Sequence, residues 1–276
     1  MTLKRKKRTG KVAPLVRALL FIVYGVPILW IVLTSLKTAN QVFNTGWGMI
    51  IFSPNLTAYT KNFTGALVQA GLQSVIISTG TSALVLLVAI PAAYGLARTT
   101  GRIPTIALGL LIVLQMVPQT ATVIPLFQIF GGWGLLDQTI GVIIADSALL
   151  TPFAILLLRP FFRGVPPALE ESGAIDGASV WRIFRSIVLP IARNGVATTA
   201  TLVFLISWGE FLYSVNFFLS PGKYPLSAVL AQQVTAFGID WPSLMALAVM
   251  TSIPILILFI ATYRQLRDGL TMGAVK

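Results

Sequence analysis

The 276-residue sequence contains no cysteine and no histidine. Disulfides, thiolate or imidazole metal sites, Cys or His nucleophiles and haem ligation by histidine are therefore excluded. Charged residues are also scarce, at 10% of the chain, where a soluble domain carries about a quarter. Hydrophobic residues make up 56%. This composition predicts an integral membrane protein and disfavours most membrane enzymes; we identify no catalytic residue and no metal ligand in the sequence.

Negative charge is especially sparse, with 8 acidic against 20 basic residues and a net charge of +12. A nucleic-acid-binding protein would gather its basic residues on one folded face. Here they are distributed among short loops between apolar runs. The sequence therefore predicts contact with membrane lipid and none with nucleic acid.

Six apolar segments are long enough to cross a membrane, which takes roughly 20 helical residues for a hydrocarbon core about 30 Å thick. The first has no small-residue cleavage pattern after it, so we interpret it as an uncleaved anchor. Several segments contain proline, which membrane helices tolerate. The predicted helices cover residues 18–36, 71–97, 104–127, 139–158, 195–218 and 241–263.

The basic residues also predict an orientation. With six spans, only Lys37, Lys61 and Lys223 lie on one side of the membrane, and the other 17 lie opposite. Lysine and arginine accumulate in cytoplasmic loops, so both termini and the loop 161–194 are expected in the cytoplasm. The predicted parts are a basic tail (1–17), a first helix with an external loop (18–67), a five-helix core (68–264) and a cytoplasmic tail (265–276).

The loop LEESGAIDGASVWRIFRSIVLP, from Leu169, holds three of the eight carboxylates. Pro166 and Pro167 predict a helix start, because the first turn does not need their missing amides. Glu170 and Glu171 suit the positive end of that helix. Gly177 predicts a left-handed cap that ends it. One face of the helix is small enough for close approach of another backbone; it carries Leu169, Ser172, Gly173 and Asp176.

A second, amphipathic piece is predicted over 179–189, after which Pro190 turns the chain back to the membrane. Its apolar stripe consists of Val180, Trp181, Phe184, Ile187 and Val188. Two interpretations fit these residues. The helix–bend–helix docks into a groove of another protein, or the second helix lies on the lipid surface.

The spacing Glu171-Ser-Gly, three residues, Gly177, nine residues, Ile187-Val-Leu189-Pro190 resembles the EAA loop of ABC-transporter permease subunits. Ser172 and Gly173 replace the two alanines of that pattern. Both are small, although Gly173 weakens a helix by about 1 kcal/mol relative to alanine. The resemblance implies that this loop docks into an ATPase subunit. The implied coupling residues are Glu170, Glu171, Ser172, Gly173, Asp176, Gly177, Ile187, Leu189 and Pro190.

The stretch SWGEFLYSVNFFLSPGKYPLSAVLA, from Ser207, and the ending GLTMGAVK resemble the smaller permease of maltose-type carbohydrate importers. This resemblance implies an all-α, type I ABC importer permease fold in a bacterial or archaeal plasma membrane. The implied function is translocation of a carbohydrate, an oligosaccharide or related polyol, that an external solute-binding protein delivers.

The chain has no G-x-x-x-x-G-K-[ST] motif and cannot hydrolyse ATP by itself. It is thus not an enzyme and holds no cofactor. The resemblance implies that ATP and Mg²⁺ are used by an ABC ATPase dimer, and that a second permease subunit completes a heterodimer.

Asp146 and Glu210 are the only carboxylates within the predicted spans, where a charge is costly and must face protein or water. Glu210 either contributes to a sugar path or forms a structural hydrogen bond between helices. Asp146 is expected to be structural, and for Gln115 and Gln119 a bond to a neighbouring helix is the favoured role. The candidate path residues are Trp208, Glu210, Tyr213, Asn216, Gln115 and Gln119.

Other functions stay open. An ABC permease for glycerol phosphate-type or other polar solutes would have a similar sequence, although an anion favours cationic partners that the later helices lack. An ion-coupled secondary transporter would use the two carboxylates, but the chain shows no internal duplication. An intramembrane aspartyl protease would need a second aspartate within a span.

Overall fold

The computed structural model describes residues 12–235 and 238–274. The fold is helical, as predicted, and its only strands in this part of the chain form a short antiparallel hairpin of β1 (Val234–Thr235) and β2 (Gly238–Ile239). The basic tail expected over 1–17 lies largely outside the described residues, and the expected C-terminal tail continues a helix to Ala274. The helices are α1 (Val12–Ser35), α2 (Ala39–Val42), η1 (Gly46–Met49), α3 (Thr57–Asn62), α4 (Gly65–Arg98), α5 (Ile103–Gln115), α6 (Gln119–Trp133), α7 (Thr139–Arg163), α8 (Pro167–Ile175), α9 (Val180–Ile183), the π-helical η2 (Phe184–Val188), α10 (Leu189–Trp208), α11 (Leu212–Phe217), η3 (Pro221–Lys223), α12 (Leu226–Ala231) and α13 (Trp241–Ala274).

Among the described residues, five continuous helical stretches are long and apolar enough to cross a membrane, and one bent pair of helices fits either a broken span or a re-entrant loop. The pair, α5 and α6, bends by 89°. The prediction of one helix over 104–127 is therefore wrong, although the count of six holds when the pair is one span. Pro118 explains the break: it lacks an N–H and disfavours helical geometry at the preceding residue, and it adopts extended backbone.

The fifth predicted span, 195–218, is also displaced. Its helix stops at Trp208, and a separate short helix, α11, begins at Leu212. At the other end the helix continues unbroken from Val180 to Trp208, so Pro190 does not turn the chain. Because proline donates no hydrogen bond, the α-helical pattern is interrupted before Pro190 by the π-helical segment η2 instead of ending there.

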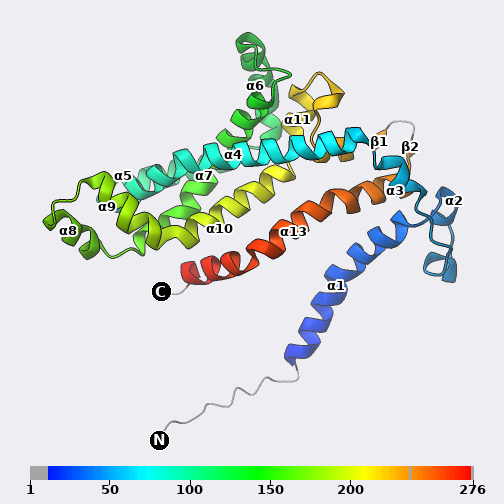
Figure 1. Cartoon of the computed structure of the whole chain (residues 1–276), viewed down its shortest axis with the longest axis horizontal. Coiled ribbons are helices and arrows are strands. Elements are labelled where there is room, and N and C mark those ends of the chain that lie inside the picture. Colours follow the sequence, from blue (N-terminus) through cyan, green and yellow to red (C-terminus); the bar gives the residue numbers. More distant parts are fainter. Residues whose placement is uncertain (1–11, 236–237, 275–276) are drawn as a thin grey trace, which may run out of the picture. The chain divides into compact units, whose positions relative to one another are not determined.

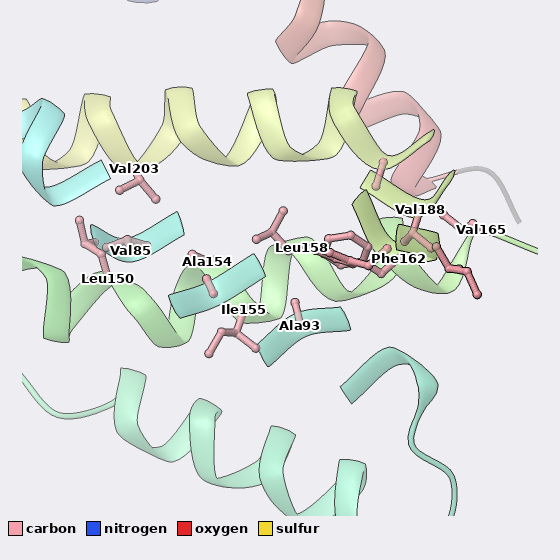
Figure 2. Packing of buried hydrophobic residues seen from close by; sticks show 14 residues of the cluster. Val85, Ala93, Leu150, Ala154, Ile155, Leu158, Phe162, Val165, Val188 and Val203 are labelled. Atoms are coloured by element: carbon pink, nitrogen blue, oxygen red, sulfur yellow. The ribbon is translucent and has the colours of Figure 1, made fainter. Parts of the chain in front are cut away.

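The chain divides into two compact units. The second, Gly65–Gln232 with the residues from Ile253 onward, has its core between α4, α7 and α10, which lie side by side (Figure 1). Alanines at positions 89, 93 and 154 let the helices approach closely, and larger side chains fill the layers between them (Figure 2). The larger buried members include Val85, Leu150, Leu158, Phe162, Val188 and Val203.

The first unit contains the chain through Thr64 and residues 233–252. Within it, the hydroxyls of Ser35 and Tyr59 lie 2.7 Å apart and join α1 to α3. The amide of Asn62 donates to the Ser243 hydroxyl of α13 at 2.7 Å. These polar contacts hold the connection between α1 and α4 to the start of α13.

Close helix packing predicts the effect of one substitution. A Cβ added at Gly195 of α10 would lie 2.2 Å from the Phe161 ring of α7, so Gly195→Ala must displace the ring or the helix. We expect a loss of unfolding free energy of about 1–3 kcal/mol, measured by thermal unfolding in detergent. Gly109→Ala in α5, where no atom lies within 4 Å of the added Cβ, is the control. Equal stability of the two variants would contradict the packing.

Candidate coupling loop and polar path

The predicted helix–bend–helix of the charged loop is present. Helix α8 ends at Ile175, and Gly177 follows with a φ of 78°. Two hydrogen bonds close the cap: Gly177 N–H to the Ala174 carbonyl and Ala178 N–H to the Gly173 carbonyl, both at 3.0 Å. This is the left-handed Schellman cap that glycine favours. The Ser179 hydroxyl then accepts a hydrogen bond from the Arg182 amide and starts α9.

The small face of α8 packs within the loop. Gly173 is buried, and a Cβ there would lie 2.9 Å from Ile187 Cδ1 and 3.2 Å from Ile183 Cγ1. The absence of a side chain thus lets α8 rest directly on α9 and η2. Ser172 is exposed, and its hydroxyl donates to the Ala168 carbonyl at 2.8 Å. The close approach predicted at Gly173 is therefore present, but the segment that approaches it is the second helix of the same loop.

Glu170 faces α4. Its carboxylate forms an ion pair with Arg98, whose Nε donates to Oε1 at 2.7 Å, and the Tyr94 hydroxyl donates to Oε2 at 2.7 Å. Arg98 also donates to the Val165 carbonyl at 3.1 Å. The Tyr94 ring packs on Phe184, with centroids 5.0 Å apart. The sequence pattern indicates Glu170 but not Arg98 or Tyr94, because no local pattern shows which distant residues bond to the Glu170 carboxylate.

The predicted apolar stripe of the second piece divides between two environments. Phe184 and Val188 belong to the buried core, and Ile187 packs against it. By contrast, Val180 is 74% exposed and Trp181 67% exposed. Ile175, at the end of α8, is 86% exposed. We call these three residues the exposed apolar edge; Glu171 and Asp176 of the same loop are also exposed.

A second polar cluster joins α6 to α11. The Glu210 Oε1 accepts hydrogen bonds from the Gln119 amide at 2.9 Å and from the Tyr213 backbone N–H at 2.7 Å. The Ser214 hydroxyl donates to Oε2 at 3.3 Å, and the hydroxyls of Tyr213 and Thr122 lie 2.7 Å apart. Both carboxylate oxygens of Glu210 thus accept hydrogen bonds from α11, and Oε1 also accepts one from α6. The structure brings three of the predicted path residues together: Gln119, Glu210 and Tyr213.

A pocket of about 360 Å³ adjoins this cluster. Tyr213 is the one predicted path residue in its lining, and Thr122 lies there with it. The other described lining residues are apolar: Leu114, Val117, Ala121, Pro125, Leu126, Ala145, Ala148, Leu149 and Pro152.

The other candidate residues of the predicted spans, Gln115, Asn216, Trp208 and Asp146, contact neighbouring protein groups. Gln115 donates to the Leu149 carbonyl of α7 at 2.9 Å, and Asn216 to the Leu212 carbonyl of its own helix at 2.7 Å. Trp208 is buried and stacks on Phe204. Asp146 accepts a hydrogen bond from the Ser207 hydroxyl, between α7 and α10.

Asp137 was not foreseen from the sequence. It has a φ of 57° and accepts hydrogen bonds from the backbone amides of Leu219 and Ser220, each at 3.0 Å. The Lys223 ammonium donates to its carboxylate at 2.8 Å, which with the Ser220 and Leu219 bonds lowers the pKa of Asp137 to about 2. It links two connections 82 residues apart in sequence, so no local pattern indicates it.

Residues 86–270 match the family described as "Binding-protein-dependent transport system inner membrane component". The chain belongs to this family. The predicted membership is therefore confirmed, and the chain is a multi-pass permease component of the membrane. Its family is not itself catalytic, as the sequence predicts.

Several permeases of this family are similar along most of their length. The probable ABC transporter permease protein y4oR of Sinorhizobium fredii is 32% identical, over 92% of this chain and 91% of its own. The trehalose transport system permease protein SugB of Mycobacterium tuberculosis is 31% identical, over 91% and 92%. The arabinooligosaccharides transport system permease protein AraQ of Halalkalibacterium halodurans is 32% identical, over 91% and 90%.

A solved structure establishes the fold independently of the sequence. A bacterial ABC transporter involved in the import of the acidic polysaccharide alginate superimposes with a TM-score of 0.75 at 19% identity. The match covers 93% of this chain and 97% of that one. The permease thus has the type I ABC importer permease fold expected from its sequence.

The Glu170–Arg98 ion pair yields a test. Glu170→Gln leaves the Arg98 guanidinium, which is mostly buried, without its counter-charge. We expect a loss of roughly 1–2 kcal/mol of unfolding free energy, measured by thermal unfolding in detergent. Glu171→Gln, at the exposed neighbouring carboxylate, should change stability by less than about 0.5 kcal/mol. Equal effects of the two substitutions would contradict a stabilising role for the pair.

Proposed function

We propose that this permease is a subunit of an ATP-driven importer that carries a carbohydrate, an oligosaccharide or related polyol, across a bacterial or archaeal plasma membrane. An external solute-binding protein delivers the solute, and a second permease subunit completes a heterodimer. Support for the solute class comes from the relatives, whose names specify trehalose and arabinooligosaccharides. Both termini and the charged loop face the cytoplasm, as the distribution of basic residues favours.

The observation that carries the coupling role is the exposed apolar edge on a loop whose other side, at Gly173, Ile183 and Phe184, is buried. Ile175, Val180 and Trp181 expose large apolar surfaces and are suited to filling a groove of an ATPase partner. That partner, a dimer, binds ATP and Mg²⁺, since this chain lacks the phosphate-binding motif. The coupling residues are those named from the EAA resemblance, and Glu170 acts among them through Arg98.

Movement of the docked loop has two routes into the membrane helices. The first is the unbroken helix from Val180 to Trp208, which joins the apolar edge directly to α10. The second is the Glu170–Arg98 ion pair, which joins α8 to the end of α4. Since α4 and α10 both pack against α7, a displacement of the loop acts on all three core helices.

The substrate side is assigned to the pocket beside α11. Tyr213 and Thr122 are the polar members of its described lining, and their hydroxyls bond to each other. An apolar lining with few polar groups suits the apolar face of a sugar ring. The described lining contains no charged side chain, which favours a neutral solute over an anion such as glycerol phosphate. Gln119 and Glu210 hold Tyr213 in place beside the pocket: their side chains bond to each other, and Glu210 accepts the Tyr213 backbone N–H.

The cap at Gly177 tests the coupling role. No atom lies within 4 Å of an added Cβ, so a substitution there acts through the positive φ alone. Gly177→Val should abolish ATP-dependent uptake, because a β-branched residue disfavours left-handed backbone. Gly177→Asn should retain much of it, because asparagine tolerates that region. Uptake is measured in proteoliposomes containing the whole transporter, with the amount of assembled protein as the control. Normal uptake by Gly177→Val would contradict the coupling role.

The proposed assembly is tested by purification from native membranes. The tagged chain, extracted in mild detergent, should bring an ABC ATPase, a second permease and an exported binding protein, identified by mass spectrometry. Ligand screening of that binding protein then identifies the solute. Recovery of the chain alone would overturn the proposal and put an ion-coupled secondary transporter first.

A further inference from the structure

The segment that follows α1 turns back along that helix. Lys37, two residues beyond the end of α1, is only 2% exposed, and its ammonium donates to the Met49 carbonyl at 2.8 Å. The same ammonium lies 5.1 Å from the ring centroids of both Trp30 and Phe52. Since Trp30 lies within the last two turns of α1, Met49 and Phe52 are held at the level of those turns.

A further bond fixes the end of this fold-back. The Asn55 backbone N–H donates to the Leu36 carbonyl at 2.7 Å. With an α-helical rise of 1.5 Å per residue, Trp30 lies about 7.5 Å before the end of α1 at Ser35. The segment therefore stays near the boundary of the apolar span instead of extending away from it, and Figure 1 shows α2 beside this end of α1.

The fold-back exposes large apolar side chains and carries no charge. Trp47 is 79% exposed, Phe43 75% and Ile51 71%. No acidic or basic residue occurs from Thr38 to Thr60. An exposed, uncharged, aromatic surface at the end of a membrane helix has the composition of a membrane–water interface, where tryptophan and phenylalanine side chains accumulate.

We propose that residues 43–52 lie in the lipid interface at the C-terminal end of α1, with Phe43, Trp47 and Ile51 at the boundary between headgroups and acyl chains. Lys37 is the clamp that holds them there. A lysine at this depth is costly unless its charge is satisfied, and the Met49 carbonyl with the Trp30 and Phe52 rings satisfies it. With the orientation proposed above, this is the outer leaflet.

The absence of charge favours lipid over a soluble partner. A docking site for a folded protein has a polar rim, and charged groups there guide association. Between Thr38 and Thr60 the chain has no charged side chain to guide such an association. The inference depends on α1 as a membrane span, and it does not depend on which solute is transported.

The absence of cysteine makes the test direct, because single cysteines can be introduced without removing any. Ile51→Cys and, as the control, Thr60→Cys, an exposed polar position in α3, are labelled with the fluorophore NBD. The complete transporter is reconstituted in phosphatidylcholine–phosphatidylglycerol vesicles with or without lipid carrying a shallow spin label. We expect blue-shifted emission and several-fold stronger quenching at position 51 than at position 60.

Equal quenching at both positions would overturn the proposal. A blue shift at position 51 that occurs only after the solute-binding protein is added, without quenching by lipid, would also overturn it and assign the surface to that protein. Because the assay reports location and requires no transport, its failure is distinct from a failure of the proposed function.

The clamp is tested with the same label. Lys37→Met removes the donor to Met49, and quenching at position 51 should fall towards the level at position 60. Lys61→Met, which removes the exposed ion pair with Asp240, is the matched control and should leave quenching at position 51 unchanged. Unchanged quenching in Lys37→Met, in protein that remains folded by its thermal unfolding profile, would overturn the role of Lys37.

Discussion

Hydrocarbon offers no hydrogen-bond partner to a peptide group, so backbone inside a bilayer must satisfy itself or borrow side chains. Two of the helix breaks in the second unit meet this constraint through side chains. One break precedes Gln119 and the other contains Glu210, and these two side chains bond to each other. Glu210 also accepts the backbone amide of Tyr213 that begins α11. The breaks are thus stabilised as a pair, and the pocket forms beside them.

The loop between α7 and α10 is continuous with both of these helices, and the carboxylate of Glu170 also attaches it to α4. As a result, one side of the loop packs against the core of the second unit and the other side is exposed. The inner side meets aromatic and aliphatic core residues, Phe162 and Phe184 among them. On the outer side Ile175, Val180 and Trp181 are mostly exposed, although the Trp181 ring also contacts Phe184, with centroids 5.6 Å apart. A surface of this kind moves as part of the helices that support it, which is the property a contact with an ATP-driven partner needs.

Much of this architecture was predictable because it depends on short-range rules. Hydropathy located α1, α4, α7 and the membrane part of α13, and the pair Pro166–Pro167 with Gly177 predicted the start and the cap of α8. Hydropathy did not predict the bend at Pro118, because proline inside an apolar run is tolerated in some membrane helices and breaks others. The outcome depends on whether a neighbour, here Glu210, bonds to the interrupted segment.

Contacts between distant segments were beyond sequence reasoning. Glu170 meets Arg98 across 72 positions, and Asp137 meets Ser220 across 83. Each depends on the rotation and height of one helix relative to another, which a periodic pattern does not specify. Arg98 and Lys223 had been used only as charges that indicate orientation. The same side chains prove to be half of the loop's attachment to α4 and half of the link between the α6–α7 connection and η3.

The π-helical segment η2 sets the direction of α9, and with it that of Val180 and Trp181, relative to α10. A π-helical turn contains one residue more than an α-helical pattern requires, and one residue of α-helix corresponds to about 100° of rotation. Phe184–Val188 therefore determines the direction in which Trp181 points relative to α10. A permease with one residue fewer in this segment would keep both helices but turn a different side of α9 outward, so the length of η2 determines which side chains the loop exposes.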